Sequence, residues 1–295
     1  MAGLTRSLVT RHALGRADAY DAALLDVAQD HLLYLLAEAG MFTDGQLAFK
    51  GGTSLRKCRL GNDGRFSTDL DFAAPNEGTV LQVCEVIDGA RVAGFEYRLD
   101  STRGDGRHWN LRVNHPDLGT PDIAGSVEFA RRPLALPTDD LAFIPLPIHK
   151  QYGFALPTLP VVAEAEACAE KLARYRRVAL GRDLYDLNQF ANRTIDEPLV
   201  RRLWVLKVWG DVVDDGRGTK PADPDEVLHH RRERDYQPDS IGVLTRPVDI
   251  TAWEARVRTR FQFLAELDDD EQRWATCDER HRREVDAALK ALRAE

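Results

Sequence analysis

Two aspartates, Asp69 and Asp71, carry the clearest chemical signal in the sequence. They alternate with Leu70 and Phe72, so on a β-strand both carboxylates project from one face and both apolar side chains from the other. Two like charges at this spacing repel each other unless a cation lies between them. Mg²⁺ prefers hard oxygen ligands and keeps coordination positions open for substrate phosphates. We therefore expect Asp69 and Asp71 to be metal ligands for Mg²⁺, with Mn²⁺ as the alternative.

A glycine pair, Gly51 and Gly52, precedes the aspartates and follows a short apolar run over 47–49 that predicts a strand. Glycines allow a sharp turn whose backbone N–H groups face an anion. Thr53 or Ser54 would then begin a helix, with its hydroxyl as the cap. In-line displacement at phosphorus needs a metal, a phosphate cradle and a few cations. Residues 51–54 are thus candidates for binding the phosphates of a nucleoside triphosphate (NTP).

Each signal also has an ordinary alternative, because glycine pairs occur in common turns and Asp-x-Asp at a strand edge can be a solvated face. Their order and spacing together resemble the nucleotidyltransferase superfamily. Two sequence motifs are similar to those of the AbiEii-type toxins, including the MenT group of mycobacterial toxin–antitoxin systems: Lys-Gly-Gly-Thr-Ser-Leu at 50–55 and Arg-x-Ser-x-Asp-Leu-Asp-Phe at 65–72. The resemblance implies an α+β fold, with a nucleotidyltransferase mixed sheet and a helical C-terminal lobe.

A second segment resembles the later motifs of the same family. Lys171 lies in a predicted helix and is followed by Arg-Asp-x-x-Asp-Leu at 182–187. The resemblance implies that Lys171 contacts the triphosphate and that Asp186 helps to organise the catalytic site. A lysine in a cleft is a point charge suited to phosphate oxygens, although most lysines are solvated helix residues. Asp183 stands where a helix N-cap would be expected after Gly181.

The superfamily also implies a third carboxylate on a neighbouring strand. The pattern over 123–129 predicts a strand, in which Glu128 points away from the face shared by Val127 and Phe129. Glu128 either completes the metal site or is an exposed residue of an edge strand. Arg65, just upstream of the aspartates, is a further candidate for phosphate contacts, as is Arg112.

Ser67 lies two residues before Asp69 and shares its face of the strand. In some related toxins a hydroxyl at this position is phosphorylated when the antitoxin acts, and Ser67 matches that position. A phosphate would add a charge of about −2 beside the metal carboxylates and oppose triphosphate binding. The resemblance thus implies regulatory phosphorylation of Ser67 in the presence of a cognate antitoxin protein. A serine with only local hydrogen bonds is the alternative.

Composition narrows the class of protein. The chain has 295 residues, 43% of them apolar and 30% charged, which is enough for a full core in two lobes. Four scattered cysteines lack metal-ligand spacing and favour a reduced cytoplasmic protein. The N-terminal residues show no signal peptide, and no apolar run is long enough to span a membrane.

The lobes are expected at 1–160 and 161–295. A packed helix is predicted over 21–39, a strand-rich mixed sheet over 47–129, and an extended crossing segment over 133–160, which holds six prolines. Helices are predicted beyond it, at 161–178, 184–191, 200–213, 251–267 and 270–294. The segment 214–246, rich in Gly, Pro and charge, is expected to be a mobile loop.

The favoured function is that of a toxin: a Mg-dependent nucleotidyltransferase that moves a nucleoside monophosphate from an NTP to an acceptor and releases pyrophosphate. The MenT resemblance implies the 3′ end of tRNA as acceptor, which would block translation. The net charge of −8 speaks against nucleic acid unless a local patch binds it. Candidate patches are Arg174/Arg176/Arg177/Arg182, Arg201/Arg202/Lys207 and Arg231/Arg232/Arg234. A protein or small-molecule acceptor, or a non-catalytic NTP- or partner-binding role, are the alternatives.

Overall fold

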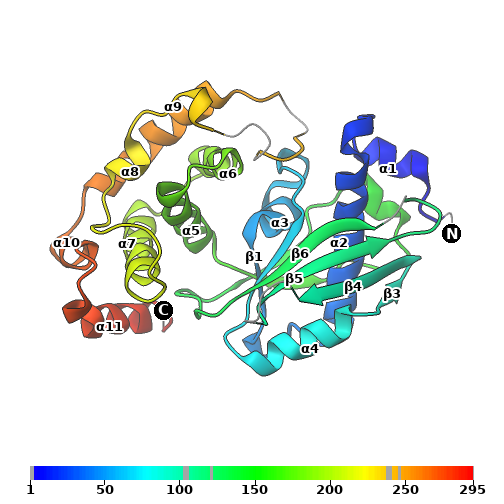
Figure 1. Ribbon diagram of the computed structural model, residues 1–295, viewed down its shortest axis with the longest axis horizontal. Coiled ribbons are helices and arrows are strands. Elements are labelled where there is room, and N and C mark those ends of the chain that lie inside the picture. The colour runs from blue at the N-terminus through cyan, green and yellow to red at the C-terminus, as the bar shows by residue number, and fades with distance from the viewer. Residues whose placement is uncertain (1–2, 102–105, 120–121, 237–240, 245–246, 295) are drawn as a thin grey trace. The chain divides into compact units, whose positions relative to one another are not determined.

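The chain forms two compact units in a computed structural model that describes residues 3–101, 106–119, 122–236, 241–244 and 247–294. The first unit comprises Met1–Pro133, Thr138–Val162 and Val243–Arg246, and the second comprises Leu134–Pro137, Ala163–Gly242 and Pro247–Glu295. The strands that the described residues form all belong to the first unit, whereas the second is built from helices (Figure 1).

A mixed sheet of eight strands forms the first unit, in the order β3-β4-β5-β6-β2-β1-β8-β7 across the described residues. β2 runs parallel to β6 and antiparallel to β1, and β1 runs parallel to β8. The predicted α+β class with a mixed sheet is confirmed. The strands are β1 Ala48–Lys50, β2 Asp69–Ala73, β3 Arg91–Val92, β4 Phe95–Ser101, β5 His108–Asn114, β6 Ile123–Ala130, β7 Asp139–Ala142 and β8 Thr158–Val161.

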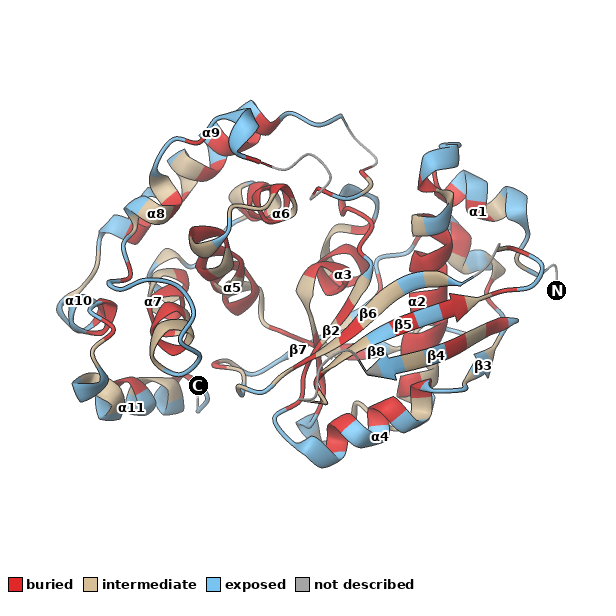
Figure 2. Cartoon of the chain, in the orientation of Figure 1, coloured by how far each residue is buried: buried red, intermediate tan, exposed pale blue. Residues whose placement is uncertain are grey.

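The longest helix of the first unit, α2, agrees with the helix predicted over 21–39. It is buried along most of its length (Figure 2), because its apolar residues recur at helical spacing and it packs against α1, α4, β3 and β6. Tyr97 on β4 donates its hydroxyl proton to the carbonyl oxygen of Ala28, which ties α2 to the sheet. The helices here are α1 Arg6–His12, α2 Tyr20–Glu38, α3 Gly51–Leu55 and α4 Glu77–Ile87.

The second unit contains the helices predicted for the C-terminal half, with two corrections. The helix expected over 251–267 ends at Arg260, and the one expected over 270–294 is two helices, separated at Cys277, whose φ of 52° is left-handed. α5 packs on α6, α7 and α8, and α6 packs on α9. The helices are α5 Glu164–Arg177, α6 Gly181–Ala191, α7 Glu197–Val213, α8 Asp225–Leu228, α9 Ile250–Arg260, α10 Asp269–Ala275 and α11 Arg282–Leu292.

The proline-rich segment 133–160 is largely extended, as predicted, but it also adds β7 and β8 to the edge of the sheet. The segment 214–246, expected to be a mobile loop, contains the short helix α8 and contacts α5 through the residues that the structure describes. Within the second unit, buried Arg176 donates to the carbonyl oxygen of Thr219 and pairs with Glu226, while the Arg231 guanidinium lies 4.6 Å from the Tyr175 ring centroid. These contacts hold the segment against α5.

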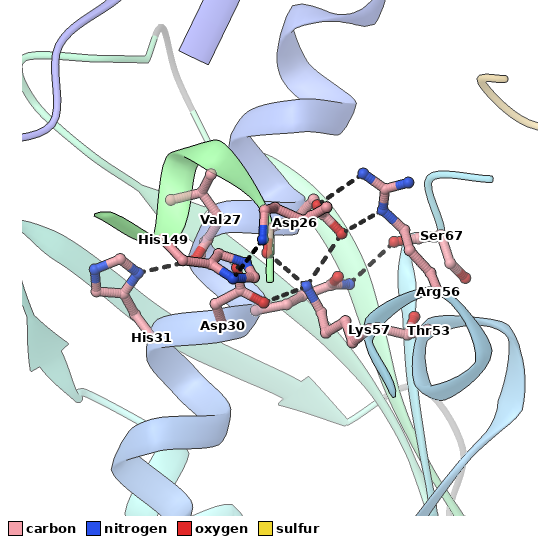
Figure 3. Close-up of polar contacts among 12 residues, drawn as sticks. Asp26, Val27, Asp30, His31, Thr53, Arg56, Lys57, Ser67 and His149 are labelled. Atoms are coloured by element: carbon pink, nitrogen blue, oxygen red, sulfur yellow. Dashed lines mark hydrogen bonds and ion pairs between the residues drawn. The ribbon is translucent and has the colours of Figure 1, made fainter. Parts of the chain in front are cut away.

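A buried network of charges joins α2 to the helical turn that follows the glycine pair (Figure 3). The turn continues α3 as a π-helical segment, Arg56–Leu60. Arg56 Nε lies 2.9 Å from Asp26 Oδ1, and Lys57 Nζ lies 2.6 Å from Asp30 Oδ1 and 3.1 Å from Asp26 Oδ1. All four side chains are at most 4% exposed. Two anions and two cations thus balance each other in the core.

Further hydrogen bonds satisfy the remaining carboxylate oxygens of this network. His12 Nε2 lies 2.8 Å from Asp26 Oδ2, and Tyr152 donates its hydroxyl proton to Asp30 Oδ2 at 2.7 Å. Burial alone would raise the pKa of Asp26, but Arg56, Lys57 and His12 together hold that pKa well below its usual value. The pKa of Asp30 is lowered against the same effect of burial by Lys57 and His149.

We predict that Lys57→Met destabilises the protein by about 3–5 kcal/mol, because it leaves buried carboxylates without their cation. Asp30→Asn combined with Lys57→Met should recover much of the lost stability.

Because the folded pKa values of Asp26 and Asp30 are depressed, the stabilisation by these two aspartates is present above pH about 4 and is lost as the pH falls below that value. Urea unfolding at neutral pH and at pH about 3 measures both effects. A loss below about 1 kcal/mol for the single variant would contradict the prediction.

Candidate active site

The strand register places the predicted metal ligands in two rows across the sheet. Asp71 on β2 is paired with Glu128 on β6, and Asp69 is paired with Ser126. Residues paired in register project from the same face, so the three carboxylates share one face of the sheet. Lys50 on β1 stands opposite Asp71 and extends its row. The predicted strand position of Glu128 is confirmed, and β6 lies between two other strands rather than at an edge.

Gly51 and Gly52 follow β1 directly, make the turn into α3 as its first two residues, and lie against the site residues. Gly51 has a φ of +78°, and a Cβ there would lie 1.9 Å from Asp71 Oδ2. A Cβ at Gly52 would lie 2.3 Å from Arg65 Nη2 and 3.4 Å from Ser67 Oγ. The first glycine is needed for both its backbone conformation and its contact with Asp71. The glycine pair thus brings the turn against both predicted motifs.

The expectation that Thr53 or Ser54 caps the helix is wrong. α3 already begins at Gly51, and no side chain caps it. Both hydroxyl-bearing residues are fully buried. Ser54 donates to the carbonyl oxygen of Gly51 at 2.9 Å, and Thr53 donates to the carbonyl oxygen of Asp69. Their side chains therefore hold the turn and the start of β2 in place, and the backbone remains the part that can meet a phosphate.

Asp69 is oriented by two hydroxyls that donate to its Oδ1. Thr68 Oγ1 lies at 2.9 Å and Ser126 Oγ, on β6, at 3.0 Å. Upstream of the strand, Gln29 on α2 donates to the carbonyl oxygen of Ser67 at 3.1 Å. The backbone that carries Asp69 is thus held from both α2 and α3.

The two arginines predicted to contact phosphate, Arg65 and Arg112, lie in different surroundings. Arg65 is 6% exposed and its guanidinium lies against the glycine turn, where a phosphate contact was expected. Arg112, on β5, is about half exposed and pairs with Asp100 at 2.8 Å. Only Arg65 is beside the predicted phosphate-binding residues.

The chemistry of the donor set fits Mg²⁺. Mg²⁺ is usually held by one or two carboxylates together with substrate phosphates, and Asp69 and Asp71 supply two carboxylates beside the glycine turn. Over the ranges that the structure describes, no three His, Cys, Asp or Glu side chains stand close enough together to hold a metal ion by themselves. The substrate would therefore have to supply part of the coordination.

The second motif forms its own charged cluster in the second unit. Lys171 on α5 lies 2.7 Å from Asp186 Oδ2 and 3.2 Å from Asp183 Oδ1, both on α6. Asp183 also pairs with Arg174 at 3.2 Å. The N-cap expected at Asp183 is wrong, because α6 begins at Gly181 and Asp183 is fully buried. Both aspartates hold the lysine ammonium, so the side chain of Asp183 has a role that the sequence left open.

The basic clusters proposed as nucleic-acid patches are largely neutralised by ion pairs. Arg201 pairs with Glu271, Arg202 with Asp268, and Lys207 with Glu166 and Glu170. Burial alone would lower the pKa of Lys207, but the two glutamates raise it instead. In the third cluster Arg231 is buried. These cations therefore stabilise the helices of the second unit.

A glycine pair that begins a helix, followed by paired carboxylates on the neighbouring strand of a mixed sheet, is the arrangement expected of a nucleotidyltransferase. A family model described as nucleotidyl transferase AbiEii toxin of type IV toxin–antitoxin systems matches residues 34–291. The chain therefore belongs to the AbiEii family of nucleotidyltransferase toxins. No curated protein matches the sequence.

One solved structure supports this family assignment. MenT4, the nucleotidyltransferase toxin Rv2826c from Mycobacterium tuberculosis H37Rv, is 77% identical, covers 99% of this chain and 100% of its own, and superposes with a TM-score of 0.96. A putative nucleotidyltransferase from H. pylori and JHP933 from Helicobacter pylori are 16% and 15% identical, with TM-scores of 0.47 and 0.45. They cover 85% and 92% of this chain and 97% and 98% of their own. At these values the two distant structures add nothing to the assignment.

Sequence reasoning missed the polar residues that contact the site from outside the motifs. Ser126 and His108 stand in the same rows as the carboxylates, and Gln29 on α2 bonds to the backbone at Ser67, just before β2. Ser126 and Glu128 do alternate with apolar residues in the sequence, which is the one signal that could have found Ser126. The pairing of His108 with Glu128 depends on strand register, which the sequence does not show.

We predict that Gly51→Ala lowers nucleotide transfer on the order of 10²-fold, because the added Cβ displaces Asp71 and misplaced catalytic groups cost about that much. Gly89→Ala is the matched control: its φ is +76°, in the same unit, and nothing lies within 4 Å of an added Cβ. Transfer rates and melting temperatures of both variants separate backbone strain from the loss of the site. Equal rates in the two variants would refute this role of Gly51.

Proposed function

We propose that the enzyme moves a nucleoside monophosphate from an NTP onto the 3′ end of tRNA and thereby blocks translation. The observation that supports this best is the contact of the glycine turn with Asp71, Arg65 and Ser67. It joins a backbone suited to phosphate oxygens to carboxylates suited to a divalent metal. The tRNA acceptor rests on resemblance to the MenT group.

In this proposal Asp69 and Asp71 hold Mg²⁺, with Mn²⁺ as a substitute. The three carboxylates do not form a metal site by themselves among the residues described, so Glu128 would join as the third ligand when the metal and the substrate phosphates are bound. A bound metal supplies charge neutralisation at the phosphates and activates the attacking hydroxyl. The backbone of Gly51 and Gly52 binds the phosphates together with Arg65. Thr53 and Ser54 act through the hydrogen bonds that hold this turn.

Lys171 is proposed to stabilise the charge that develops on the leaving pyrophosphate. Its ammonium is paired with Asp183 and Asp186. Two carboxylates hold a flexible lysine in one rotamer, which lowers the entropy lost when a phosphate binds. Asp186 is thus proposed to be essential through the position of Lys171.

The reaction requires NTP and RNA in one compartment, so we propose that the enzyme acts in the cytoplasm together with a cognate antitoxin. Across the part of the chain described, no helix has the length and apolarity needed to cross a membrane. With a net charge of −8, binding of tRNA would depend on local cations. Arg174 is a candidate, since its side chain is 40% exposed beside Lys171.

We predict that purified enzyme with Mg²⁺ and total tRNA incorporates label from an α-³²P-labelled NTP into RNA on a denaturing gel. Asp69→Ala should give no label, and Lys171→Met should lower the rate on the order of 10²–10³-fold, as for loss of one transition-state charge contact. Asp214→Ala is the control, since its ion pair with Arg282 is on the surface. NTP binding without labelled RNA would move the acceptor to a protein or small molecule, or leave a non-catalytic NTP-binding role.

We further propose that the antitoxin inactivates the enzyme through phosphorylation of Ser67. A phosphate there would place about −2 charges beside Asp69 and against Gly52. Ser67 is 5% exposed and the neighbouring Phe66 N–H donates to the carbonyl oxygen of Val243, so the segment must open before a kinase can reach it.

We predict a mass increase of one phosphate on the peptide that contains Ser67 after co-expression with the antitoxin, and loss of transfer activity in that species. Ser67→Ala should show no mass increase. Mass spectrometry with an activity assay of the same sample makes the comparison. An inhibited enzyme with unmodified Ser67 would exclude this route.

A further inference from the structure

Two polar residues outside the family's motifs contact the carboxylates of the proposed metal site from the neighbouring strands. Ser126 on β6 is paired with Asp69, and His108 on β5 is paired with Glu128. In each case a hydrogen-bond donor and a carboxylate stand side by side on one face of the sheet. The two pairs occupy adjacent rows.

The first pair is set by a close approach of the strands. Ser126 Oγ donates to Asp69 Oδ1 at 3.0 Å, and Ser126 N donates to the carbonyl oxygen of Thr68 at 3.2 Å. The preceding residue is Gly125, where a Cβ would lie 2.7 Å from that same carbonyl oxygen. A glycine at 125 therefore lets β6 come near enough for the serine hydroxyl to reach Asp69.

The second pair joins His108 Nδ1 to Glu128 Oε1 at 3.0 Å. The side chain of Glu128 is 47% exposed, and that of His108 is 25% exposed. An exposed glutamate has three rotatable bonds and loses entropy when it is fixed. The imidazole of His108 has only two rotatable bonds, so it is itself well fixed on β5. Its hydrogen bond therefore restricts the side chain of Glu128.

We infer that Ser126 and His108 are positioning residues that orient Asp69 and Glu128 toward the metal. The inference rests on the proposed function, since it assumes that these carboxylates bind a divalent ion. Ligating carboxylates are commonly hydrogen-bonded by a second layer of residues, and loss of such a partner typically weakens metal binding about 10–100-fold. The donors act through the carboxylates and need not contact the metal or the NTP.

The test measures metal affinity directly. Mn²⁺ is titrated into the enzyme alone, and free Mn²⁺ is followed by its electron paramagnetic resonance signal; a second titration with a non-hydrolysable NTP analogue is corrected for the Mn²⁺ that the analogue binds without enzyme. Ser126→Ala and His108→Leu remove the donors, whereas Ser126→Thr keeps a hydroxyl and His108→Asn keeps an N–H near the position of Nδ1. His229→Leu, on an exposed histidine, is the control.

Ser126→Ala and His108→Leu should each raise the dissociation constant for Mn²⁺ about 10–100-fold. Ser126→Thr, His108→Asn and the control should stay near the wild-type value, and melting temperatures should be similar throughout. In a Glu128→Gln background, His108→Leu should have no further effect, because it acts through that carboxylate. A purely structural histidine would not show this coupling.

Two results would overturn the inference. One is an unchanged Mn²⁺ affinity in both Ser126→Ala and His108→Leu. The other is that His108→Leu lowers the Mn²⁺ affinity by the same factor in the wild-type and the Glu128→Gln backgrounds. Normal Mn²⁺ binding by a wild-type enzyme that transfers no nucleotide would overturn only the proposed function. Absence of Mn²⁺ binding by the wild type would overturn the inference and the metal dependence together.

Discussion

The buried pairing of Asp26 and Asp30 with Arg56 and Lys57 is the interaction on which the rest of the first unit depends. Charges in a core are tolerated only where opposite charges and hydrogen bonds satisfy them, so this network admits one arrangement of α2 against the turn after α3. That turn directly continues α3, which begins with Gly51 and Gly52. The position of Gly51 and Gly52, which we propose to bind phosphate, is therefore set by ion pairs between residues outside the proposed site.

The register of the strands then determines where the carboxylates lie relative to this turn. α3 holds the start of β2 through Thr53, and β2 shares its register with β6, so that a shift of one residue would turn every carboxylate to the opposite face. Ser126 and the closely approaching Gly125 oppose such a shift. The site is thus assembled from backbone pairing first, and from side-chain contacts second.

The local pattern of the sequence predicts the elements and the motifs that they carry. Periodicity located α2, β6 and the helical second unit, and the resemblance assigned the family, because these depend on residues near one another in the chain. The local sequence pattern could not show that Lys57 is neutralised by aspartates of α2, or that Asp183 pairs with Lys171. Nor could it show that the helix predicted over 270–294 is interrupted at Cys277. Each of these depends on partners distant in sequence or on a single backbone angle. The ion pairs of Arg201, Arg202 and Lys207 were hidden for the same reason, since their partner carboxylates lie on or next to other helices.

The ion pairing of its arginines and lysines limits how the enzyme could recognise a polyanion. Acidic residues exceed basic ones, and many arginines and lysines of the second unit are already paired within α5, α7 and α10. A protein of this kind gains little from long-range attraction, because steering depends on a net positive field. Discrimination among acceptors must then come from short-range contacts made after encounter. Such contacts suit a single chain end, which needs only a few well-placed groups, better than a long stretch of backbone phosphates.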